Sequence, residues 1–188
     1  MGLRVQTFNK GVFVSLVIPG SPAAMAGLRF GDQLLTLGKT ELAGKTRESV
    51  HCMLKYFTPA FNHKNYKLNC RCCPVNNIVL AVRDRPLCRS VVLTKDKAGR
   101  LGIKLKHGRV EAIAVNSTAA RNGLLTDQQI VEVNGCCVVG QTDKCIRECI
   151  EKESDMVTVT IMQRDVFIQL MRGMSEYLVK SKNMIPSP

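Results

Sequence analysis

The sequence contains no tryptophan, and only 5% of its residues are aromatic. Proteins that hold single-stranded nucleic acid stack its bases on aromatic side chains, so we expect no nucleic-acid partner. The chain also has no apolar run of the roughly 18 residues that a membrane-spanning helix requires, and its first residues lack the apolar stretch and cleavage site of a secretory signal. These absences predict a cytoplasmic protein.

The sequence also lacks the cysteine spacing of a disulfide framework or a zinc site. Its nine cysteines are odd in number, and zinc sites usually combine two Cys-x-x-Cys pairs, or one such pair with two histidines. The nearest group is His63, Cys70, Cys72 and Cys73, whose spacing fits neither pattern. A surface loop of reduced thiols is the favoured interpretation and a metal or partner site the alternative, so we predict no metal and no cofactor.

Catalytic motifs are missing as well. The sequence has no G-x-S-x-G, H-E-x-x-H or phosphate-binding P-loop pattern. His51 and Cys52 are neighbours, but a catalytic dyad needs a base that reaches the nucleophile and a third group that orients the base, and neither is evident. We therefore predict that the chain is not an enzyme.

What the chain has in excess is positive charge, with a formal net charge of +12. Such a charge favours anionic partners, among which acidic peptide tails and the inner membrane leaflet are candidates. The basic residues are scattered through both halves of the chain rather than gathered in one arm. Charge alone therefore does not choose between these partners.

An internal repeat organises the chain, because residues 21–44 align with residues 117–140 without a gap. Self-similarity of this kind indicates two copies of one fold. We predict a first domain over residues 1–86, a second over 88–164, and a helical tail over 165–188. The identical pairs are Ser21/Ser117, Ala23/Ala119, Ala24/Ala120, Gly27/Gly123, Leu28/Leu124, Gln33/Gln129 and Gly44/Gly140.

Each copy is predicted to be mainly β with two helices, a small partly open barrel or sandwich. Ser21 and Ser117 are candidate N-caps of short helices, and longer helices are expected at 47–55 and 143–152. An apolar stripe at 166–179 predicts a further helix, which either packs back on the domains, the favoured interpretation, or lies on a membrane surface. Short β-branched and apolar runs predict strands at 12–17, 34–37, 78–82, 91–93, 103–105, 110–115, 130–133 and 156–162.

These patterns resemble a known family. The second copy combines Leu101-Gly102-Ile103, the motif S-x-A-A-x-x-G-L, a strand that ends in Asn134-Gly135, and a following helix, which is similar to the PDZ domain. Stretches 27–33, 83–86 and 119–126 resemble the syntenins, of which this chain looks like a divergent or variant member. The resemblance implies an adaptor that binds the C-terminal tails of transmembrane proteins, syndecan-like tails among them, by β-strand addition.

The resemblance also implies which residues hold the tail. A loop of backbone N–H groups binds the terminal carboxylate, and alternate side chains enter pockets. In the second copy the implied residues are Leu101, Gly102, Ile103, Lys104, Leu105, Asp143, Arg147 and Ile150. In the first copy they are Gly2, Leu3, Arg4, Val5, Arg47, His51 and Leu54.

Individual roles in the second copy follow from the same resemblance. Ile150 closes the pocket for the last ligand side chain, and Asp143 meets the ligand residue two before the end. Arg147 departs from the small residue that the relatives carry, and it either narrows the groove or favours an acidic ligand side chain.

The first copy looks altered. It begins at Met1-Gly2, without the strand that precedes the carboxylate loop in the second copy, and it carries an extra segment at about 56–76. Missing pairing leaves an open sheet edge, and breakers such as Pro59 and Pro74 favour a surface loop. We therefore expect the second domain to be the competent binder.

Syntenins are also expected to bind phosphoinositides such as phosphatidylinositol-4,5-bisphosphate through lysines beside the carboxylate loop. Lys95 and Lys106 stand at matching positions with Lys104 and Arg100 nearby, but Thr142 replaces a lysine. Phosphoinositide binding with a weak or lost peptide groove is therefore the alternative function. It would place the protein at the plasma membrane; the resemblance also suggests a nuclear pool and leaves homodimerisation open.

Overall fold

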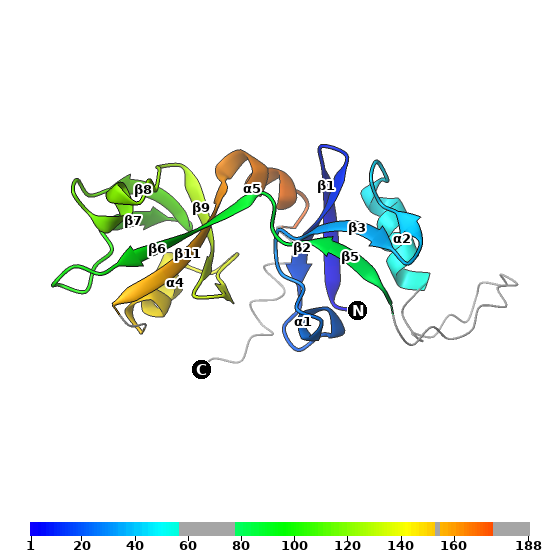
Figure 1. Cartoon of the computed structure of the whole chain (residues 1–188), viewed down its shortest axis with the longest axis horizontal. Coiled ribbons are helices and arrows are strands. Elements are labelled where there is room, and N and C mark those ends of the chain that lie inside the picture. Colours follow the sequence, from blue (N-terminus) through cyan, green and yellow to red (C-terminus); the bar gives the residue numbers. More distant parts are fainter. Residues whose placement is uncertain (57–77, 153–154, 175–188) are drawn as a thin grey trace, which may run out of the picture. The chain divides into compact units, whose positions relative to one another are not determined.

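The computed structural model describes residues 1–56, 78–152 and 155–174. The chain divides into two compact units, Met1–Pro86 and Leu87–Pro188, and Figure 1 labels the elements of each. The extra segment expected at about 56–76, with its candidate metal ligands, lies almost wholly outside the described residues. Within the described ranges, no helix is long and apolar enough to cross a membrane.

Unit 1 is an antiparallel sheet with two helices. Its strands follow the order β1-β2-β3-β4, and β5 also pairs with β3. The elements are β1 (Leu3–Phe8), β2 (Gly11–Val17), α1 (Pro22–Met25), β3 (Gln33–Leu37), β4 (Thr40–Glu41), α2 (Arg47–Tyr56) and β5 (Leu80–Arg83).

The core of unit 1 forms where β1, β2 and β3 meet α2. On α2, Val50 and Leu54 are one helical turn apart and share a face, and both are buried. They pack with Val5 and Leu34 in one apolar cluster. Because this face holds α2 against the sheet, the helix lies beside the edge strand β1.

Unit 2 repeats this plan and adds a strand and a helix. Its strand order is β6-β11-β9-β8-β7, and β10 pairs with β9. The elements are β6 (Cys88–Thr94), β7 (Ile103–Lys106), β8 (Arg109–Ile113), α3 (Thr118–Arg121), β9 (Gln128–Val133), β10 (Cys136–Cys137), α4 (Asp143–Glu151), β11 (Met156–Gln163) and α5 (Arg164–Leu170).

The added strand distinguishes the two sheets. In unit 2, β11 lies between β6 and β9, with Met156 opposite Thr94 at one end of the β6 ladder. In the described part of unit 1, the corresponding strand β5 pairs only with β3. The outer edge of β5 is therefore unpaired among the described residues, an arrangement that the first-copy sequence had suggested.

The repeated serines cap equivalent short helices in the two units. The hydroxyl of Ser21 accepts a hydrogen bond from Ala24 N–H at 3.3 Å, and that of Ser117 accepts one from Ala120 N–H at 3.2 Å. Each serine thereby caps its short helix, as predicted from the sequence.

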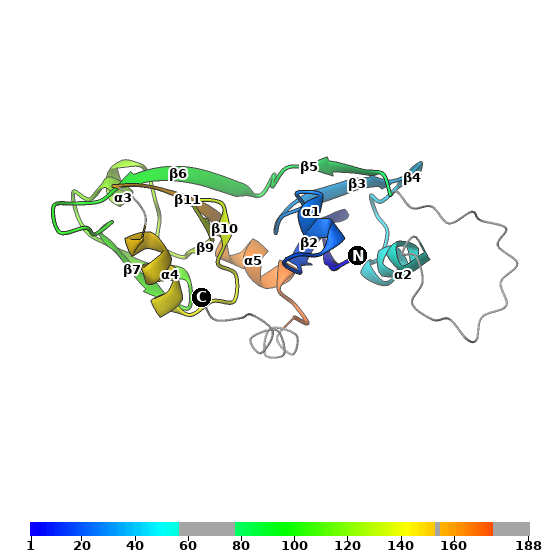
Figure 2. The same cartoon turned by 90° about the horizontal axis from the view of Figure 1, so that it is seen from below.

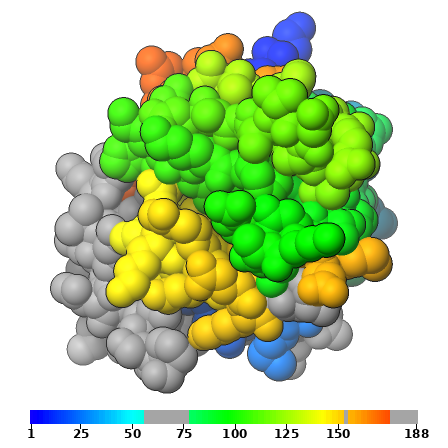
Figure 3. Space-filling view, turned by 90° about the vertical axis from the view of Figure 1, so that its left-hand side faces the viewer, coloured from blue at the N-terminus to red at the C-terminus, as the bar shows by residue number. Residues whose placement is uncertain are grey.

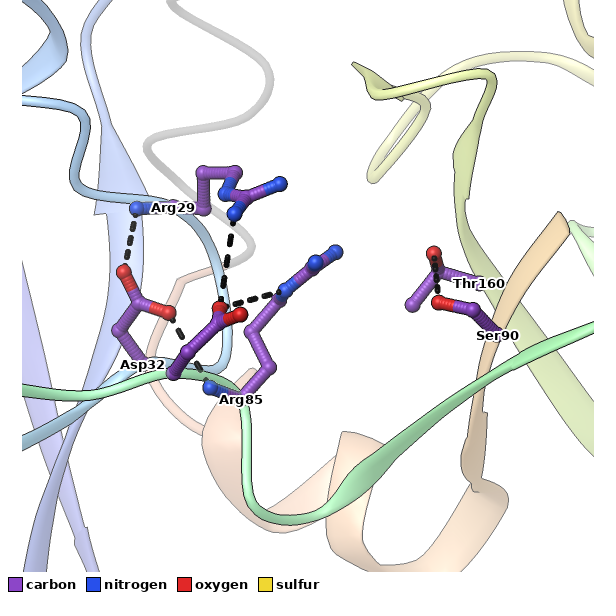
Figure 4. Close-up of polar contacts among 6 residues, drawn as sticks. Arg29, Asp32, Arg85, Ser90 and Thr160 are labelled. Carbon is purple, nitrogen blue, oxygen red and sulfur yellow. Dashed lines mark hydrogen bonds and ion pairs between the residues drawn. The ribbon is translucent and has the colours of Figure 1, made fainter. Parts of the chain in front are cut away.

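A buried carboxylate joins two loops of unit 1 (Figure 4). Asp32 is 4% exposed, and its oxygens accept hydrogen bonds from Arg29 N–H at 2.8 Å and from Arg85 N–H at 3.2 Å. Asp84 pairs with the side chains of both arginines. Asp32 therefore fixes the end of β5 to the loop that precedes β3. Figure 4 also shows the hydroxyls of Ser90 and Thr160, which lie 3.1 Å apart across β6 and β11 of unit 2.

The tail helix is shorter than its apolar stripe predicted. α5 ends at Leu170, and Gly173 follows with a φ of 74°. α5 lies against β9 and β11, and Leu170 and Met174 are buried. The described part of the tail therefore packs on the protein, in agreement with the favoured interpretation, while residues 175–179 of the stripe lie outside the described residues.

Candidate peptide-binding site

In unit 2 the candidate site lies between an edge strand and a helix. β7 is the last strand in its sheet, so its outer backbone groups have no strand partner in the described residues, and α4 lies beside it in both Figure 1 and Figure 2. Ile103 and Leu105 are half-buried against the core, which contains Ile146 and Ile150 of α4. An edge strand next to a helix can accept one further antiparallel strand.

The loop before β7 presents unpaired N–H groups. Gly102 has a φ of 73°, and its carbonyl accepts a hydrogen bond from Ala114 N–H at 2.7 Å. Across the ranges that the structure describes, the N–H groups of Leu101 and Gly102 donate to no protein acceptor. Successive N–H groups in such a turn form a site for an anion. The predicted carboxylate loop thus has the donors that its role requires.

Glycine is needed at position 102 for two reasons. A positive φ is strained for any residue with a Cβ, and a Cβ added here would lie 2.5 Å from Ser117 Cβ. Unit 1 has the same arrangement, since a Cβ on Gly2 would lie 2.2 Å from Ser21 Cβ. The repeated glycine and serine are therefore one packing unit, which brings the loop close to the short helix.

Asp143 ties the start of α4 to the turn between β7 and β8. Its two carboxylate oxygens accept hydrogen bonds from His107 N–H at 2.9 Å and from Gly108 N–H at 2.7 Å. Desolvation raises the pKa of Asp143, but these two hydrogen bonds and the His107 and Arg147 charges outweigh it and hold the pKa below its ordinary value. Both oxygens thus already serve the fold, and the predicted contact with a ligand stays a prediction.

Arg147 lies one turn beyond Asp143 on α4. The side chain is exposed, and its Nε donates to the Asp143 carbonyl at 3.2 Å. The guanidinium is therefore anchored along the helix rather than fully extended from it. Both interpretations of this arginine, a narrower groove and a preference for an acidic side chain, remain open predictions.

The predicted phosphoinositide-binding lysines of β7 are paired with an acid. Lys104 Nζ lies 2.8 Å and Lys106 Nζ 3.7 Å from the Glu111 carboxylate on the neighbouring strand β8. Hydrogen bonding from Lys104 is the main influence on Glu111 and lowers the pKa of its carboxyl, with further help from the Lys106 charge. The sequence analysis missed Glu111, because its position opposite the two lysines depends on the β7–β8 register.

The other two predicted cations are also engaged. Arg100 forms an ion pair with Asp96, its Nε lying 3.4 Å from the carboxylate, and Lys95 Nζ donates to the Glu151 carbonyl at 3.3 Å. Three of the four cations therefore face carboxylates, which reduces the local positive potential that a phosphoinositide head group would experience.

Figure 3 looks at unit 2, with the yellow surface of α4 next to the green surface of residues near 100. The residues predicted for the second copy thus lie on three neighbouring elements, the loop before β7, β7 itself and α4. Lys104 is the exception among them, because it alternates with Ile103 and Leu105 and pairs with Glu111 instead of facing α4.

Unit 1 has a matching site. β1 is the edge strand, Gly2 has a φ of 74°, and the Gly2 carbonyl accepts from Ile18 N–H at 2.9 Å. Leu54 occupies the place on α2 that Ile150 has on α4, since each lies seven residues after the first residue of its helix, and both are buried. The structure thus brings Gly2, Leu3 and Val5 together with α2.

His51 faces this strand from α2, at the position that corresponds to Arg147. Desolvation is the main influence that lowers the pKa of His51, and the nearby charges of Arg47 and Arg4 lower it further, while a hydrogen bond with the Val5 carbonyl opposes them. His51 is therefore a neutral side chain directed at the backbone of the edge strand at neutral pH. Its surroundings are cationic.

Unit 1 also has a cavity that the sequence did not predict. Its volume is about 510 Å³, and it lies between the β1–β2 turn and the start of α2. The residues that line it are Gln6, Thr7, Phe8, Asn9, Lys10, Gly44, Lys45, Thr46, Arg47 and Glu48. Of these, only Arg47 was a predicted site residue.

Comparisons with known proteins identify relatives by sequence. No family model matches the chain. Syntenin-1 of Mus musculus is 38% identical over 181 residues, which are 96% of this chain and 55% of the relative, and Syntenin-2 of Mus musculus is 35% identical over 178 residues, or 95% and 56%. A solved choanoflagellate SHANK1 PDZ domain bound to a GIRK3 peptide covers 41% of this chain and 92% of its own length, at 22% identity and a TM-score of 0.38.

Two copies of an antiparallel sheet, each with an edge strand, a glycine loop and an adjoining helix, define a tandem pair of PDZ domains. The chain belongs to the syntenin family of PDZ proteins. It spans about half the length of the curated relatives it matches.

Proposed function

We propose that this chain is a non-enzymatic adaptor whose PDZ domains capture the C-terminal tails of transmembrane proteins, syndecan-like tails among them. The observation that carries the proposal is that two features adjoin. Among the described residues, the outer edge of β7 pairs with no strand, and the N–H groups of Leu101 and Gly102 donate to no protein acceptor. An extended tail needs a strand to pair with and a donor set for its terminal carboxylate. This site offers both.

The mechanism is β-strand addition. The tail pairs antiparallel to β7, and main-chain hydrogen bonds hold it whatever its sequence. Its carboxylate accepts from the Leu101–Gly102 loop, and its last side chain enters the apolar surface of Ile103 and Ile150. Full burial of an apolar side chain contributes roughly 1.5–3 kcal/mol, so the final residue gives affinity as well as specificity.

The second domain is the principal binder in this proposal. It has the complete sheet, with β6 against β11, so its edge is supported by a larger structure. Unit 1 has the glycine loop and the edge strand but a smaller sheet. It is therefore the second tail site in this proposal.

The test is fluorescence anisotropy of the full chain with a labelled syndecan-type C-terminal peptide, beside the same peptide amidated at its end. We expect binding that amidation reduces by about tenfold or more, since a charge-assisted hydrogen bond to a carboxylate contributes roughly 1.5–3 kcal/mol. In the Gly102→Ala variant, the clash with Ser117 is expected to abolish most of this binding. Equal binding of the acid and amide peptides would refute carboxylate capture.

Phosphoinositide binding is the alternative, with the protein peripheral at the plasma membrane. The pairing of Lys104, Lys106 and Arg100 with acids argues for a weaker interaction than the bare sequence suggested. Salt separates the two functions, because membrane attraction falls strongly with ionic strength, whereas a tail held by backbone bonds weakens less. Vesicle binding tighter than tail binding at 0.15 M salt would reverse the order.

A further inference from the structure

The two domains differ at the far end of their sites. In unit 1 the edge strand β1 has 6 residues, whereas β7 in unit 2 has 4. The turn after β7 is fastened to the helix start by the two hydrogen bonds from His107 and Gly108 to Asp143. In unit 1 the β1–β2 turn is tied instead by the backbone hydrogen bond from Gly44 N–H to the Lys10 carbonyl at 2.7 Å, and the cavity lies beside this contact.

The position of Asp143, which holds the turn in unit 2, is occupied in unit 1 by a residue of opposite charge. Thr46 and Thr142 are equivalent, since each hydroxyl accepts from the N–H three residues on, Ser49 at 3.2 Å and Cys145 at 3.3 Å. The residue after each threonine begins the long helix. It is Asp143 in unit 2 and Arg47 in unit 1, so a carboxylate that holds a turn is replaced by a guanidinium beside an open cavity.

The cavity of about 510 Å³ is cationic. Lys10, Lys45 and Arg47 line it against one carboxylate, Glu48. In the parts of the chain that the structure describes, none of these three cations forms an ion pair. Phe8 adds an aromatic wall, its ring centre lying 6.2 Å from that of Phe13. The cavity thus combines an aromatic wall with an excess of positive charge, three cations against one carboxylate.

The register places this cavity along a bound tail. With the tail carboxylate at Gly2, an antiparallel strand on β1 advances about 3.3 Å per residue. The cavity begins at Gln6, four residues beyond Gly2, so roughly 13 Å separate the two points. A tail therefore reaches the cavity with its fourth to sixth residues from the end.

We infer that the cavity of unit 1 selects tails that carry an acidic side chain among the fourth to sixth residues counted from the C-terminal end. This inference rests on the proposed tail capture and names the specificity of its first domain. Each cation–carboxylate contact at a partly exposed site strengthens binding by a small factor, and three converging cations are expected to give roughly a fivefold preference for Glu over Gln. The preference should shrink in salt.

The test uses the full chain and two labelled peptides that end in the same apolar residue. The peptides differ only by Glu or Gln at the fifth residue, counting the C-terminal residue as the first. Amidated versions of both report carboxylate capture. A phosphoserine version distinguishes a carboxylate site from a phosphate site. Shifts of backbone amide resonances locate the binding, and we expect the Glu peptide to move residues 6–10 and 45–48.

Two variants each remove one positive charge, the first inside the cavity and the second outside it. Lys45→Gln removes one of the three cations from the cavity, and we expect it to lower the Glu-to-Gln preference from about fivefold to about threefold. Lys39→Gln is the matched control, because Lys39 is exposed and does not line the cavity, and it should leave the preference unchanged.

The outcomes separate the two levels of the proposal. Carboxylate-dependent binding of both peptides with equal affinity would overturn the acidic preference and leave tail capture standing. Binding of neither acid peptide would overturn tail capture and the inference with it. An undiminished preference in Lys45→Gln, or shifts confined to unit 2, would show that this cavity does not cause the preference.

Discussion

Replacing Asp143 by alanine is expected to destabilise unit 2 and to loosen the turn that borders its peptide site. The carboxylate accepts two backbone hydrogen bonds, at 2.9 Å from His107 and 2.7 Å from Gly108. Gly108 is buried, whereas His107 is exposed, so only the Gly108 N–H loses its partner without easy access to water. An unsatisfied buried donor costs about 1–3 kcal/mol.

The magnitude follows from this asymmetry. The His107 N–H can turn to water, and the partly exposed Asp143 side chain is screened by solvent. We therefore expect a loss of about 1–2 kcal/mol in the free energy of unfolding of unit 2. For a unit of this size such a loss lowers the melting temperature by roughly 4–8 °C for each kcal/mol.

The assay is urea unfolding followed by amide signals assigned to unit 2, at pH 7 and pH 3. The pKa of Asp143 is held below its ordinary value, so its stabilisation is present above that ordinary value and disappears as the pH falls through the lowered one. The difference between the native chain and Asp143→Ala should therefore be full at pH 7 and smaller at pH 3.

Two control variants sharpen the result. Asp143→Asn keeps one acceptor oxygen and should lose about half as much stability. Glu148→Ala removes an exposed carboxylate on the same helix, whose partner Lys144 lies 3.8 Å away, and should change stability by less than about 0.5 kcal/mol. Equal stability of Asp143→Ala and the native chain at pH 7, with unchanged His107 and Gly108 amide exchange, would refute the role of this carboxylate as a turn fastener.

Two further predictions concern other carboxylates. Glu111→Gln should release the Lys104 and Lys106 ammonium groups. Binding to vesicles that contain phosphatidylinositol-4,5-bisphosphate should then strengthen by roughly two- to fivefold at low salt. Unchanged vesicle binding in a sedimentation assay would show that these lysines do not face the membrane. Asp32→Ala should cost unit 1 about 2 kcal/mol, because Arg29 N–H and Arg85 N–H lose their acceptor, and thermal unfolding with signals assigned to unit 1 measures this loss.

The pH dependence of Asp32 runs opposite to that of Asp143. Desolvation is the largest influence on Asp32 and raises the pKa of its carboxyl in spite of the hydrogen bonds from Arg29 and Arg85. A raised folded-state pKa means that the native state binds the proton more tightly than the unfolded chain does, so this group contributes less stability as the pH rises from the ordinary carboxyl range through the raised value. The Asp32→Ala chain should lack this decline.

The repeat made much of the fold predictable. The gapless match of residues 21–44 with 117–140 contains both N-caps and both helix-ending glycines, and the structure has Ser21 and Ser117 as caps. Such features are local, because a cap is a contact over three residues and a positive φ depends on one residue. Most strand positions followed from short β-branched runs for the same reason, but β1 and the two-residue strands β4 and β10 were not among the predicted runs.

The apolar stripe of the tail shows where local pattern was insufficient. Its spacing predicted a helix to residue 179, yet α5 ends at Leu170. Periodicity shows that side chains share a face but does not show where packing ends. Met174 lies beyond the end of α5 and is nevertheless buried. An apolar residue in the stripe therefore indicated burial here, not helix.

The roles of charged residues depended on partners far away in the sequence. Lys104 and Lys106 were expected to face a lipid head group, and only the β7–β8 register revealed Glu111 beside them. Asp143 was expected to meet a ligand, and only the folded turn brought two backbone N–H groups 35 and 36 residues away to its carboxylate. A charge–charge distance between strands is a tertiary quantity, which a linear pattern does not contain.

Family membership, two copies of one fold and the positions of the glycine loops were therefore legible in the order of residues, because each rests on short motifs. The cavity beside Arg47 and the hydrogen bonds by which Asp143 holds the β7–β8 turn of unit 2 were decided by tertiary structure alone. The reason is physical: a motif fixes local backbone shape, whereas the space between a turn and a helix depends on how two separate segments pack.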